Sequence, residues 1–330
     1  MTRAVLAVRL VNVASTVGDR DALLGALAAA PQEFFSQFIH SIIDREVREK
    51  WIDRSGEPHR PLLNLDEHYH LLSLIAIEMW VNRTGLLSED LIDVVGDLFS
   101  EAYQKTPVVA KQIRERIKQH ALIIRTATGR MGAYAFDHEE FRGFFLGWGT
   151  AKAFEQKNWL ELKRVLEVDI LPQQAAETAV HFIREFAGQL TSTVEELVNL
   201  CSREPRTSLV RENIGSLVIR LLDQADGGGV VVRDLVFPAD CLSGKRLRNV
   251  VFDRCHFQPT SVEGAFLDAC RFTHCTFDRL DLPSRPEIRN VRLETCVFKC
   301  VIQLDGDVPL YHPAAIEPVL RRLLYQLADL

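Results

Sequence analysis

The sequence has no long apolar run. None of its 330 residues belongs to an uninterrupted apolar stretch of about 18 residues, the length that a membrane-spanning helix needs. The N-terminal segment MTRAVLAVRLVNVAS is apolar only in short pieces, because Arg9 and Asn12 interrupt it, and it lacks a small-residue cleavage site. We therefore expect a cytoplasmic protein with no membrane partner.

A phosphate-binding loop is also missing. The pattern G-x-x-x-x-G-K-[ST] occurs nowhere, and Ser243-Gly-Lys-Arg246 lacks both the first glycine and the hydroxyl after the lysine. Without this loop a chain has no backbone cradle for phosphates and no hydroxyl ligand for Mg²⁺. We expect this chain by itself to hold no nucleotide cofactor and to hydrolyse no ATP.

Catalytic and metal-binding arrangements are equally scarce. His138-Glu-Glu is not the H-E-x-x-H pattern, because no second histidine follows at the required spacing. His68 and His70 would point apart on a helix, so we expect surface histidines there instead of a metal pair. No Ser/His/Asp or Cys/His arrangement can be argued from spacing. The sequence predicts no catalytic residue, no metal site and a protein that is not an enzyme.

Cysteine is limited to seven residues, an odd number without a secretory signal, which indicates a reducing compartment. Six of them fall between residues 241 and 300. A zinc site at Cys270-x4-Cys275, beside His256 and His274, is one interpretation of this cluster. Stacked small hydrophobic residues explain the same positions without any ligand geometry, so we expect core thiols.

Charge is nearly balanced. The net charge is −6, and residues 231–330 carry thirteen basic and thirteen acidic side chains, so the negative excess lies in the first 230 residues. Proteins that bind nucleic acid, or imitate it, need a strong excess of one sign on the surface concerned. The balance argues against a nucleic-acid partner.

What the sequence does contain is an apolar residue at every fifth position. This large column includes Leu242, Leu247, Phe252, Phe257, Val262, Leu267, Phe272, Phe277 and Leu282, and after a one-residue slip it resumes with Ile288, Leu293 and Phe298. A small column lies two residues upstream, with Val250, Cys255, Thr260, Ala265, Cys270, Cys275, Val291 and Cys296. Helices repeat at 3.6 residues and strands at 2, so neither fits. A square solenoid with four five-residue sides per coil does, its coils stacked about 4.8 Å apart.

These columns resemble the pentapeptide-repeat family, whose pattern is Ala-Asp/Asn-Leu-X-X, over about residues 232–303. The sequence departs from the family where it replaces the Asp/Asn after the small residue, as at His256, Phe266, Arg271 and Thr276. The resemblance implies a right-handed quadrilateral β-helix. An amphipathic helix over 313–330 is expected to cover one end of it, or to dock back on the helical part, because an open end would pair with other chains.

The first 225 residues predict one helix after another. Pro31 suits the first turn of a helix, Asn64 or Asp66 caps another, and Ser88 caps the next. Residues 54–63, with a glycine and two prolines, predict an exposed loop. The expected helices are 4–17, 19–30, one from residue 31, 66–83, 89–102, 108–120, 159–167, 173–188, 194–201 and 209–224.

Residues 121–136 interrupt the helices with two short strand-like segments around a glycine turn at 129–132, and a long helix follows. Helices, a hairpin and a further helix predict a winged helix. The segment resembles the end of the ATPase module in NACHT and related STAND-type signalling NTPases, where a strand precedes Phe-x-His-x-x-Phe-x-Glu-Phe/Tyr-Phe. The matching residues are Phe136, His138, Phe141 and Phe144 or Phe145, with Gly143 where the family usually has Glu. The segment PQEFFSQFIHSIIDREVREKW is similar to the family's preceding helical segment.

The resemblance covers about residues 1–155 and implies the C-terminal half of a larger NTPase, as a fragment or a split gene. ATP or ADP would then be bound only by an ATPase domain supplied in cis or in trans. It also implies that His138 can face the nucleotide β-phosphate and favour a closed, ADP-bound state, a task suited to an imidazole. The alternative is that His138 caps the new helix and packs behind the wing.

We therefore predict an α+β chain in four parts. Residues 1–155 are the helical segment and winged helix, 156–226 a helical block, 227–305 the pentapeptide-repeat solenoid, and 306–330 the capping helix. The boundary before the solenoid is placed at the three glycines 227–229, which end the last helix of the block.

Three functions from different classes remain. The first is a non-catalytic regulatory and sensor portion of a STAND-type NTPase, in which the winged helix gates nucleotide state and the solenoid binds a ligand or protein partner, with oligomerisation possible. Bacterial members of that family act in signalling or antiphage defence. The second is a free-standing pentapeptide-repeat binding protein, such as a DNA mimic that occupies a topoisomerase, which the neutral solenoid disfavours. The third is an enzyme with an unrecognised site, which no cluster of side chains supports. We favour the first.

Overall fold

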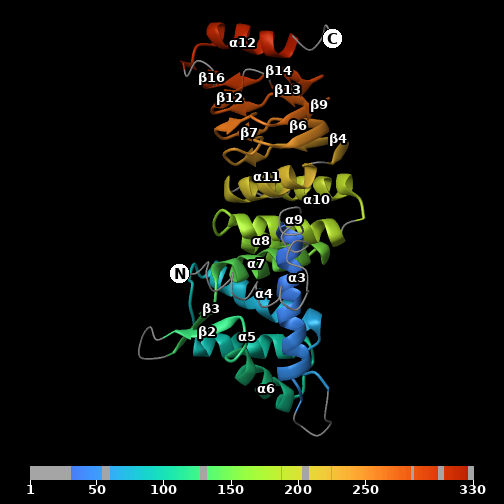
Figure 1. Ribbon diagram of the computed structural model, residues 1–330, viewed down its shortest axis with the longest axis vertical. Helices are drawn as coiled ribbons and strands as arrows, with labels where there is room; N and C mark the ends of the chain where they lie inside the picture. The colour runs from blue at the N-terminus through green and yellow to red at the C-terminus, as the bar shows by residue number, and fades with distance from the viewer. Residues whose placement is uncertain are drawn as a thin grey trace, which may run out of the picture. The chain divides into compact units, whose positions relative to one another are not determined.

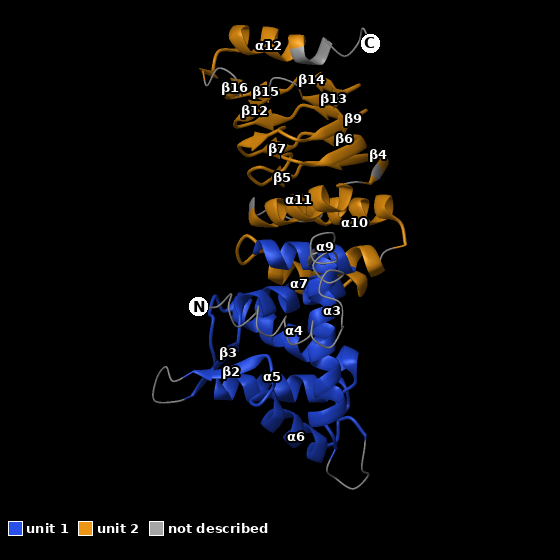
Figure 2. Cartoon of the chain, in the orientation of Figure 1, with its two compact units in different colours: residues 1–153, 172–182 blue, residues 154–171, 183–330 orange. Residues whose placement is uncertain are grey.

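The computed structural model describes residues 31–53, 60–126, 132–186, 188–202, 208–223, 225–283, 286–303 and 308–325. The predicted helices 4–17 and 19–30, and most of the predicted turn at 129–132, lie outside these ranges. The chain is α+β, with a helical N-terminal part, a β-solenoid and a short C-terminal helix, as predicted (Figure 1). It divides into two compact units, residues 1–153 with 172–182, and residues 154–171 with 183–330 (Figure 2). Among the described helices, none is long and apolar enough to cross a membrane.

Unit 1 begins with α3 (Pro31–Arg45), which runs into a π-helical turn (Glu46–Lys50). The next helix, α4 (Leu65–Val81), starts at a capping box. The Asn64 side chain accepts a hydrogen bond from the Glu67 N–H at 2.8 Å, and the Glu67 carboxylate accepts one from the Asn64 N–H at 2.9 Å. The predicted helix start at Pro31 and the predicted Asn64 cap are both confirmed.

A small sheet interrupts the helices of unit 1. Its parts follow in the order β1 (Leu87–Ser88), α5 (Glu89–Ala102), α6 (Pro107–Ile117), β2 (Ile123–Thr126) and β3 (Ala133–Phe136). The strands are antiparallel and lie in the order β1-β3-β2. A helix, a strand, two helices and then a hairpin that returns to the first strand is the topology of a winged helix. The predicted hairpin is therefore confirmed, and β1 is a third strand that the sequence did not indicate.

The helix after the wing, α7 (Glu139–Glu155), carries the aromatic run into the core of unit 1. Its N-terminal half contributes three buried rings, those of Phe141, Phe144 and Phe145. Gly147 on α7 faces Ala175 of α9 (Gln173–Phe186), and a Cβ at residue 147 would lie 2.4 Å from the Ala175 carbonyl oxygen. The two helices therefore approach this closely only because residue 147 has no side chain.

Unit 2 begins with helices that precede the solenoid: α8 (Trp159–Leu166), α10 (Leu190–Ser202) and α11 (Ser208–Leu222). The fully buried side chain of Asn213 ties the end of α8 to α11. Its Oδ1 accepts a hydrogen bond from the Leu171 N–H at 2.8 Å, and its Nδ2 donates to the carbonyls of Leu166 and Asp169 at 2.9 and 2.8 Å. The buried amide is thus satisfied at both ends, as buried polar groups generally are.

The helix α11 packs against β5 (Val236–Phe237) in the first coil of the solenoid. A Cβ on Gly215 would lie 2.1 Å from the Val236 carbonyl oxygen, so the helix can lie here only without a side chain at this position. The compact units therefore keep α10 and α11 with the solenoid. In this position α11 covers an end of the solenoid that would otherwise be open.

The solenoid is built from short parallel strands on four sides. The first side holds β4 (Asp226–Arg233), β6 (Arg246–Asp253), β10 (Arg271–Thr273) and β14 (Arg292–Glu294), and the second holds β5, β7 (His256–Phe257), β11 (Thr276–Phe277) and β15 (Val297–Phe298). The third holds β8 (Thr260–Ser261), β12 (Leu280–Leu282) and β16 (Val301–Gln303), and the fourth holds β9 (Phe266–Asp268) and β13 (Glu287–Arg289), with the start of the long strand β6. Phe252 pairs with Phe272, and Phe272 with Leu293, so one coil takes 20 or 21 residues. Four sides of five residues, with one slip, are thereby confirmed.

The predicted large column fills the axis. On one side the rings of Phe237, Phe257, Phe277 and Phe298 stack with successive centroid distances of 4.7, 4.6 and 4.8 Å. On the next side Phe252 stacks on Phe272 at 4.9 Å. These distances match the usual spacing between neighbouring strands, so each coil adds one ring to each stack.

The predicted small column also points inward, and its thiols are part of the core. Six of the seven cysteines are buried, and Cys296 is partly exposed. Four S–H groups donate hydrogen bonds to backbone carbonyls one coil earlier, in the pairs Cys255–Val232 (3.4 Å), Cys270–Leu247 (3.6 Å), Cys275–Phe252 (3.4 Å) and Cys296–Phe272 (3.2 Å). The cysteines thus serve as small hydrophobic residues whose S–H groups also donate weak hydrogen bonds to backbone carbonyls of the preceding coil.

Candidate binding site at the end of the solenoid

The last coil has an open edge on most of its sides. Within the described part of the chain, strands β13, β14 and β15 each pair with the preceding coil and with no other strand. On the remaining side, β17 (Pro309–Leu310) adds to β16 in antiparallel orientation, so the chain closes that edge itself. Open strand edges present backbone donors and acceptors to any chain that can pair with them.

On β14, the backbone N–H and C=O of Leu293 face this open edge. The Arg292 N–H donates to the Cys270 carbonyl at 3.0 Å, and the Glu294 carbonyl accepts from the His274 N–H at 2.8 Å, so both residues bond to the coil below. Backbone groups of successive strand residues point to opposite edges, so those of Leu293 point away from the solenoid.

The same alternation applies to Phe298, which lies between Val297 and Lys299. The N–H groups of these neighbours donate to the preceding coil, to the carbonyls of Cys275 at 2.8 Å and Phe277 at 2.9 Å. The Phe298 backbone therefore also faces the open edge. Together, Leu293 and Phe298 offer two N–H and two C=O groups there.

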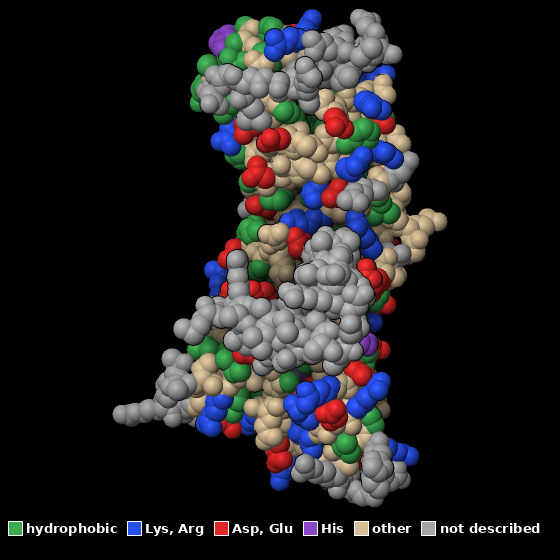
Figure 3. Space-filling model, viewed as in Figure 1, with side chains coloured by type: hydrophobic (Ala, Val, Ile, Leu, Met, Phe, Trp, Pro, Cys, Tyr) green, Lys and Arg blue, Asp and Glu red, His purple; other side chains and the backbone are tan. Residues whose placement is uncertain are grey.

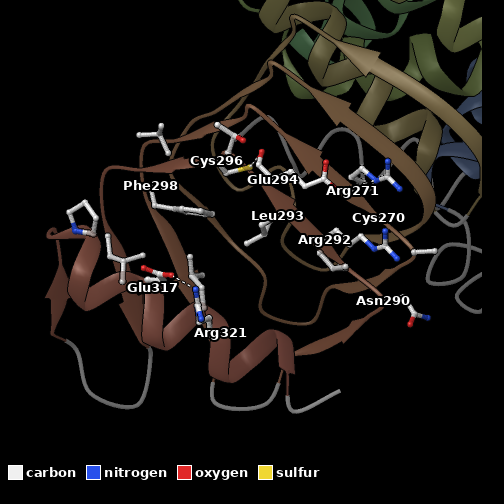
Figure 4. A pocket seen from close by; sticks show the side chains of 17 residues that line it. Cys270, Arg271, Asn290, Arg292, Leu293, Glu294, Cys296, Phe298, Glu317 and Arg321 are labelled. Carbon is white, nitrogen blue, oxygen red and sulfur yellow. Dashed lines mark hydrogen bonds and ion pairs between the residues drawn. The ribbon is translucent and has the colours of Figure 1, made fainter. Parts of the chain in front are cut away.

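A cavity of about 1100 Å³ lies between this edge and the terminal helix α12 (Pro313–Tyr325) (Figure 4). Its solenoid wall includes Leu293 and Phe298, whose side chains are only partly buried, unlike the axial residues of the coils below. Its helix wall includes Ile316 and Leu320. The cavity therefore exposes the end of the apolar axis under a helix that does not fill the space.

The rim of the cavity is charged. The Arg271 Nε lies 3.7 Å from Oε1 of Glu294, and the Arg321 Nη2 of α12 lies 2.6 Å from Oε1 of Glu317. Arg292, next to Arg271 in register, has no ion-pair partner among the described residues. Figure 4 shows Arg271 and Arg292 pointing in the same direction at one side of the cavity. The rim thus has one positive charge in excess, which suits a ligand or partner with an apolar part and a negative group.

The cavity thiols do not offer a nucleophile at neutral pH. Burial raises the pKa of Cys270 to about 11. The hydrogen bond to Cys275, followed by burial, raises the pKa of Cys296 well above its usual value. Nucleophilic cysteines generally have a lowered pKa, so neither thiol has the property expected of a nucleophile.

The residue predicted from the sequence for nucleotide contact, His138, belongs to unit 1 and not to this cavity. It lies just before α7, and its carbonyl accepts the first helical bonds, from the N–H groups of Phe141 and Arg142. Its ring is buried edge-on against Phe141, with Nε2 3.9 Å from an Asp137 carboxylate oxygen. Neither ring nitrogen has a hydrogen-bond partner among the described residues. The backbone therefore provides the cap, and the imidazole is left as a buried polar group.

Two further buried histidines were not recognised from the sequence. His68 of α4 and His120 both pack against Trp51, with ring centroids 4.6 and 5.8 Å from the indole and 5.7 Å from each other. Within the described residues, both nitrogens of His68 and the Nε2 of His120 lack hydrogen-bond partners. The prediction that His68 is a surface histidine is wrong, because its side chain lies on the buried face of α4. His70 is partly exposed, and its Nδ1 lies within hydrogen-bond distance of the Tyr103 hydroxyl. No local signal joins positions 68 and 120, which are far apart in the chain.

Comparison with protein-family models gives no match for this chain, and comparison with curated proteins gives none either. Within the described residues, no group of three His, Cys, Asp or Glu side chains has an arrangement that could hold a metal ion.

Proposed function

We propose that this chain is a non-catalytic regulatory and sensor portion of a STAND-type signalling NTPase. In this proposal the winged-helix unit responds to the nucleotide state of an ATPase domain in cis or in trans. The solenoid receives a ligand or protein partner at the cavity under α12. Bacterial signalling, including defence against phage, is the setting that the resemblance implies.

The observation that carries the proposal is the cavity itself. Helix α12 lies over the last coil but, in the described part of the chain, leaves the edges of β13, β14 and β15 without a paired strand. Only the edge of β16 is paired among the described residues, by β17. Large clefts with an apolar lining and a few polar groups are the usual binding sites of proteins. The solenoid face in Figure 3 supports a binding role over nucleic-acid mimicry, because acidic and basic side chains are interspersed on it.

The resemblance supports the regulatory half of the proposal. The motif residues on which the resemblance rests, His138 and the aromatic residues of α7, are buried in this chain. An imidazole with no hydrogen-bond partner among the described residues keeps its donor and acceptor available for a group that approaches when the module rearranges.

The binding half can be tested with an apolar anion of small size, anilinonaphthalene sulfonate, whose fluorescence rises in apolar surroundings. We expect one saturable site per chain. Leu320→Trp, which fills the cavity from α12, should weaken binding roughly tenfold or more because the apolar space is lost. Leu160→Trp is the matched control, since Leu160 on α8 is 80% exposed and does not line the cavity. Equal binding by both variants, or no saturable site in the parent chain, would contradict the proposed function.

A further inference from the structure

We infer that the cavity binds an extended peptide segment of a partner protein, which adds as a strand to the open edge at β14 or β15 and alternates apolar with acidic side chains. This inference rests on the proposed function and names the chemical class of the partner.

The chain itself shows that this edge accepts an added strand. β17 pairs with β16 through Val301 with Leu310 and Ile302 with Pro309. The strand arrives from outside the coil sequence and lies on the same outer edge that β14 and β15 leave open. Peptide binding by strand addition uses this geometry, with main-chain hydrogen bonds for affinity and side-chain pockets for specificity.

The backbone groups of Leu293 and Phe298 are the docking points for such a strand. In a parallel added strand, the peptide residues whose side chains point outward would place their N–H and C=O toward these groups, as Arg292 and Glu294 do toward the coil below. In an antiparallel one, as β17 is on β16, the inward-facing residue opposite would do so. A peptide residue level with Leu293 would point its side chain inward. There it would meet the side chains of Phe298, Ile316 and Leu320, which line the cavity.

The alternation of a strand then assigns the chemistry of the peptide side chains. Inward positions meet the exposed end of the apolar axis, so they favour apolar residues. Outward positions lie beside Arg292, whose guanidinium lacks a described partner, whereas Glu294 and Glu317 are already paired with arginines. A carboxylate there would gain a charge-assisted hydrogen bond.

The size and shape of the cavity also suit a peptide. Its volume of about 1100 Å³ lies at the upper end of the roughly 300–1,000 Å³ of small-molecule sites and has room for an extended segment. Its lining runs without interruption from residue 290 to residue 298 along two sides of the coil, as an extended chain would require.

The first test uses a labelled seven-residue probe, Glu-Val-Glu-Leu-Glu-Val-Glu, with blocked ends, and its binding is measured by fluorescence anisotropy. The alternation presents glutamates outward in either strand direction. N-methylation of one alternate set of amides should weaken binding roughly tenfold or more, because those amides face β14 or β15, whereas N-methylation of the other set should have little effect. The sensitive set is that of the inner glutamates if the strand adds in parallel, and that of the apolar residues if it adds antiparallel, as β17 does on β16. Equal losses from the two methylation patterns would overturn strand addition.

The second test reverses the charge. The chain should bind the probe more tightly than a matched probe with lysine in place of glutamate. Arg292→Glu should invert this order. Arg248→Glu, an exposed arginine on β6 that does not line the cavity, is the control and should leave the order unchanged. An unchanged order in Arg292→Glu would exclude the assigned role of Arg292 and with it the acidic partner.

The outcomes separate this inference from the proposed function. If anilinonaphthalene sulfonate binds in the cavity but the peptides do not, the peptide inference is wrong and the binding site remains. If neither binds, both are wrong. If sedimentation shows that the chain self-associates and Arg292→Glu makes it monomeric, the occupant of the edge is a second copy of this chain, and the inference of a separate partner is overturned.

Discussion

At the scale of single residues, the least satisfied polar groups of unit 1 are its buried imidazoles. Burial lowers the pKa of His68 to about 3. Burial, with His68 and Lys50 nearby, lowers the pKa of His120 well below its ordinary value. Lys50 also pairs with the buried Glu46 at 2.6 Å, which places a charged pair on the π-helical turn that precedes Trp51. Both imidazoles are therefore neutral in the folded protein at pH 7.

These lowered pKa values make unit 1 sensitive to acid. Unfolded histidine titrates near pH 6.5, so protons bind the unfolded state more strongly, and stability is complete above that pH. Between about pH 6.5 and the folded pKa, each buried imidazole should remove roughly 1.4 kcal/mol of unfolding free energy per pH unit. We expect denaturant unfolding, followed by tryptophan fluorescence, to show this loss between pH 6.5 and 4.5.

His68→Leu should flatten that pH dependence, because it removes one titrating group whose ring nitrogens have no described partner to lose. His40→Gln is the control, since His40 is exposed on α3. If His68→Leu and the parent chain lose stability in parallel as the pH falls, the buried pair is not the cause of acid sensitivity.

At the scale of elements, the two helices next to the solenoid have opposite relations to it. The helix α11 lies directly on the first coil through Gly215, whereas α12 leaves a cavity above the last coil. A solenoid needs both ends covered to avoid pairing with other chains. We therefore propose that the closely packed end is structural and that the loosely covered end is the binding site.

Gly215→Ala tests the close packing of α11. Alanine within a helix normally stabilises it by about 1 kcal/mol relative to glycine. Here the added Cβ would lie 2.1 Å from a carbonyl oxygen, so the substitution should instead lower the unfolding free energy by roughly 1–3 kcal/mol. Gly188→Ala is the matched control, because a Cβ there meets no atom within 4 Å. A more stable Gly215→Ala protein in thermal or denaturant unfolding would show that α11 does not rest on the coil as described.

Much of the architecture could be predicted from local patterns. The five-residue columns specify the solenoid, because whether each position points inward or outward does not depend on distant parts of the chain. Asn64 and Ser88 cap the N-termini of their helices by accepting hydrogen bonds from backbone N–H groups three residues later. Replacement of Asp/Asn after the small residues did not disturb the coils. Their corners hold stacked residues with positive φ, such as Arg254 and His274, and the Arg254 N–H still donates to the Thr273 carbonyl of the next coil at 2.9 Å.

The candidate site could not be predicted in the same way. The solenoid could be identified as a binding surface, but the cavity depends on where α12 lies above the last coil, and no local pattern specifies that distance. The helix was expected to cover one end of the solenoid or to return to the helical block, and the buried Ile316 places it at the solenoid end. The docking of Gly215 on Val236 and the pairing of His68 with His120 were missed for the same reason, since each joins residues far apart in sequence.

At the scale of the whole molecule, we propose that the chain binds partners and leaves nucleotide chemistry to another domain. The cavity at the solenoid end supports the first part, and the missing phosphate-binding loop supports the second. Both parts can be examined on one sample, because a ligand that binds the folded state slows hydrogen exchange at the amides it covers.

The most direct measurement is hydrogen exchange on the purified chain alone, with Mg·ATP, and with the glutamate probe. We predict that Mg·ATP leaves exchange unchanged throughout the chain. The probe should slow exchange in peptides that contain the Leu293 and Phe298 amides and in the first turns of α12, with the winged helix unaffected. Protection of unit 1 by Mg·ATP, or no protection of residues 290–298 by the probe, would contradict the account.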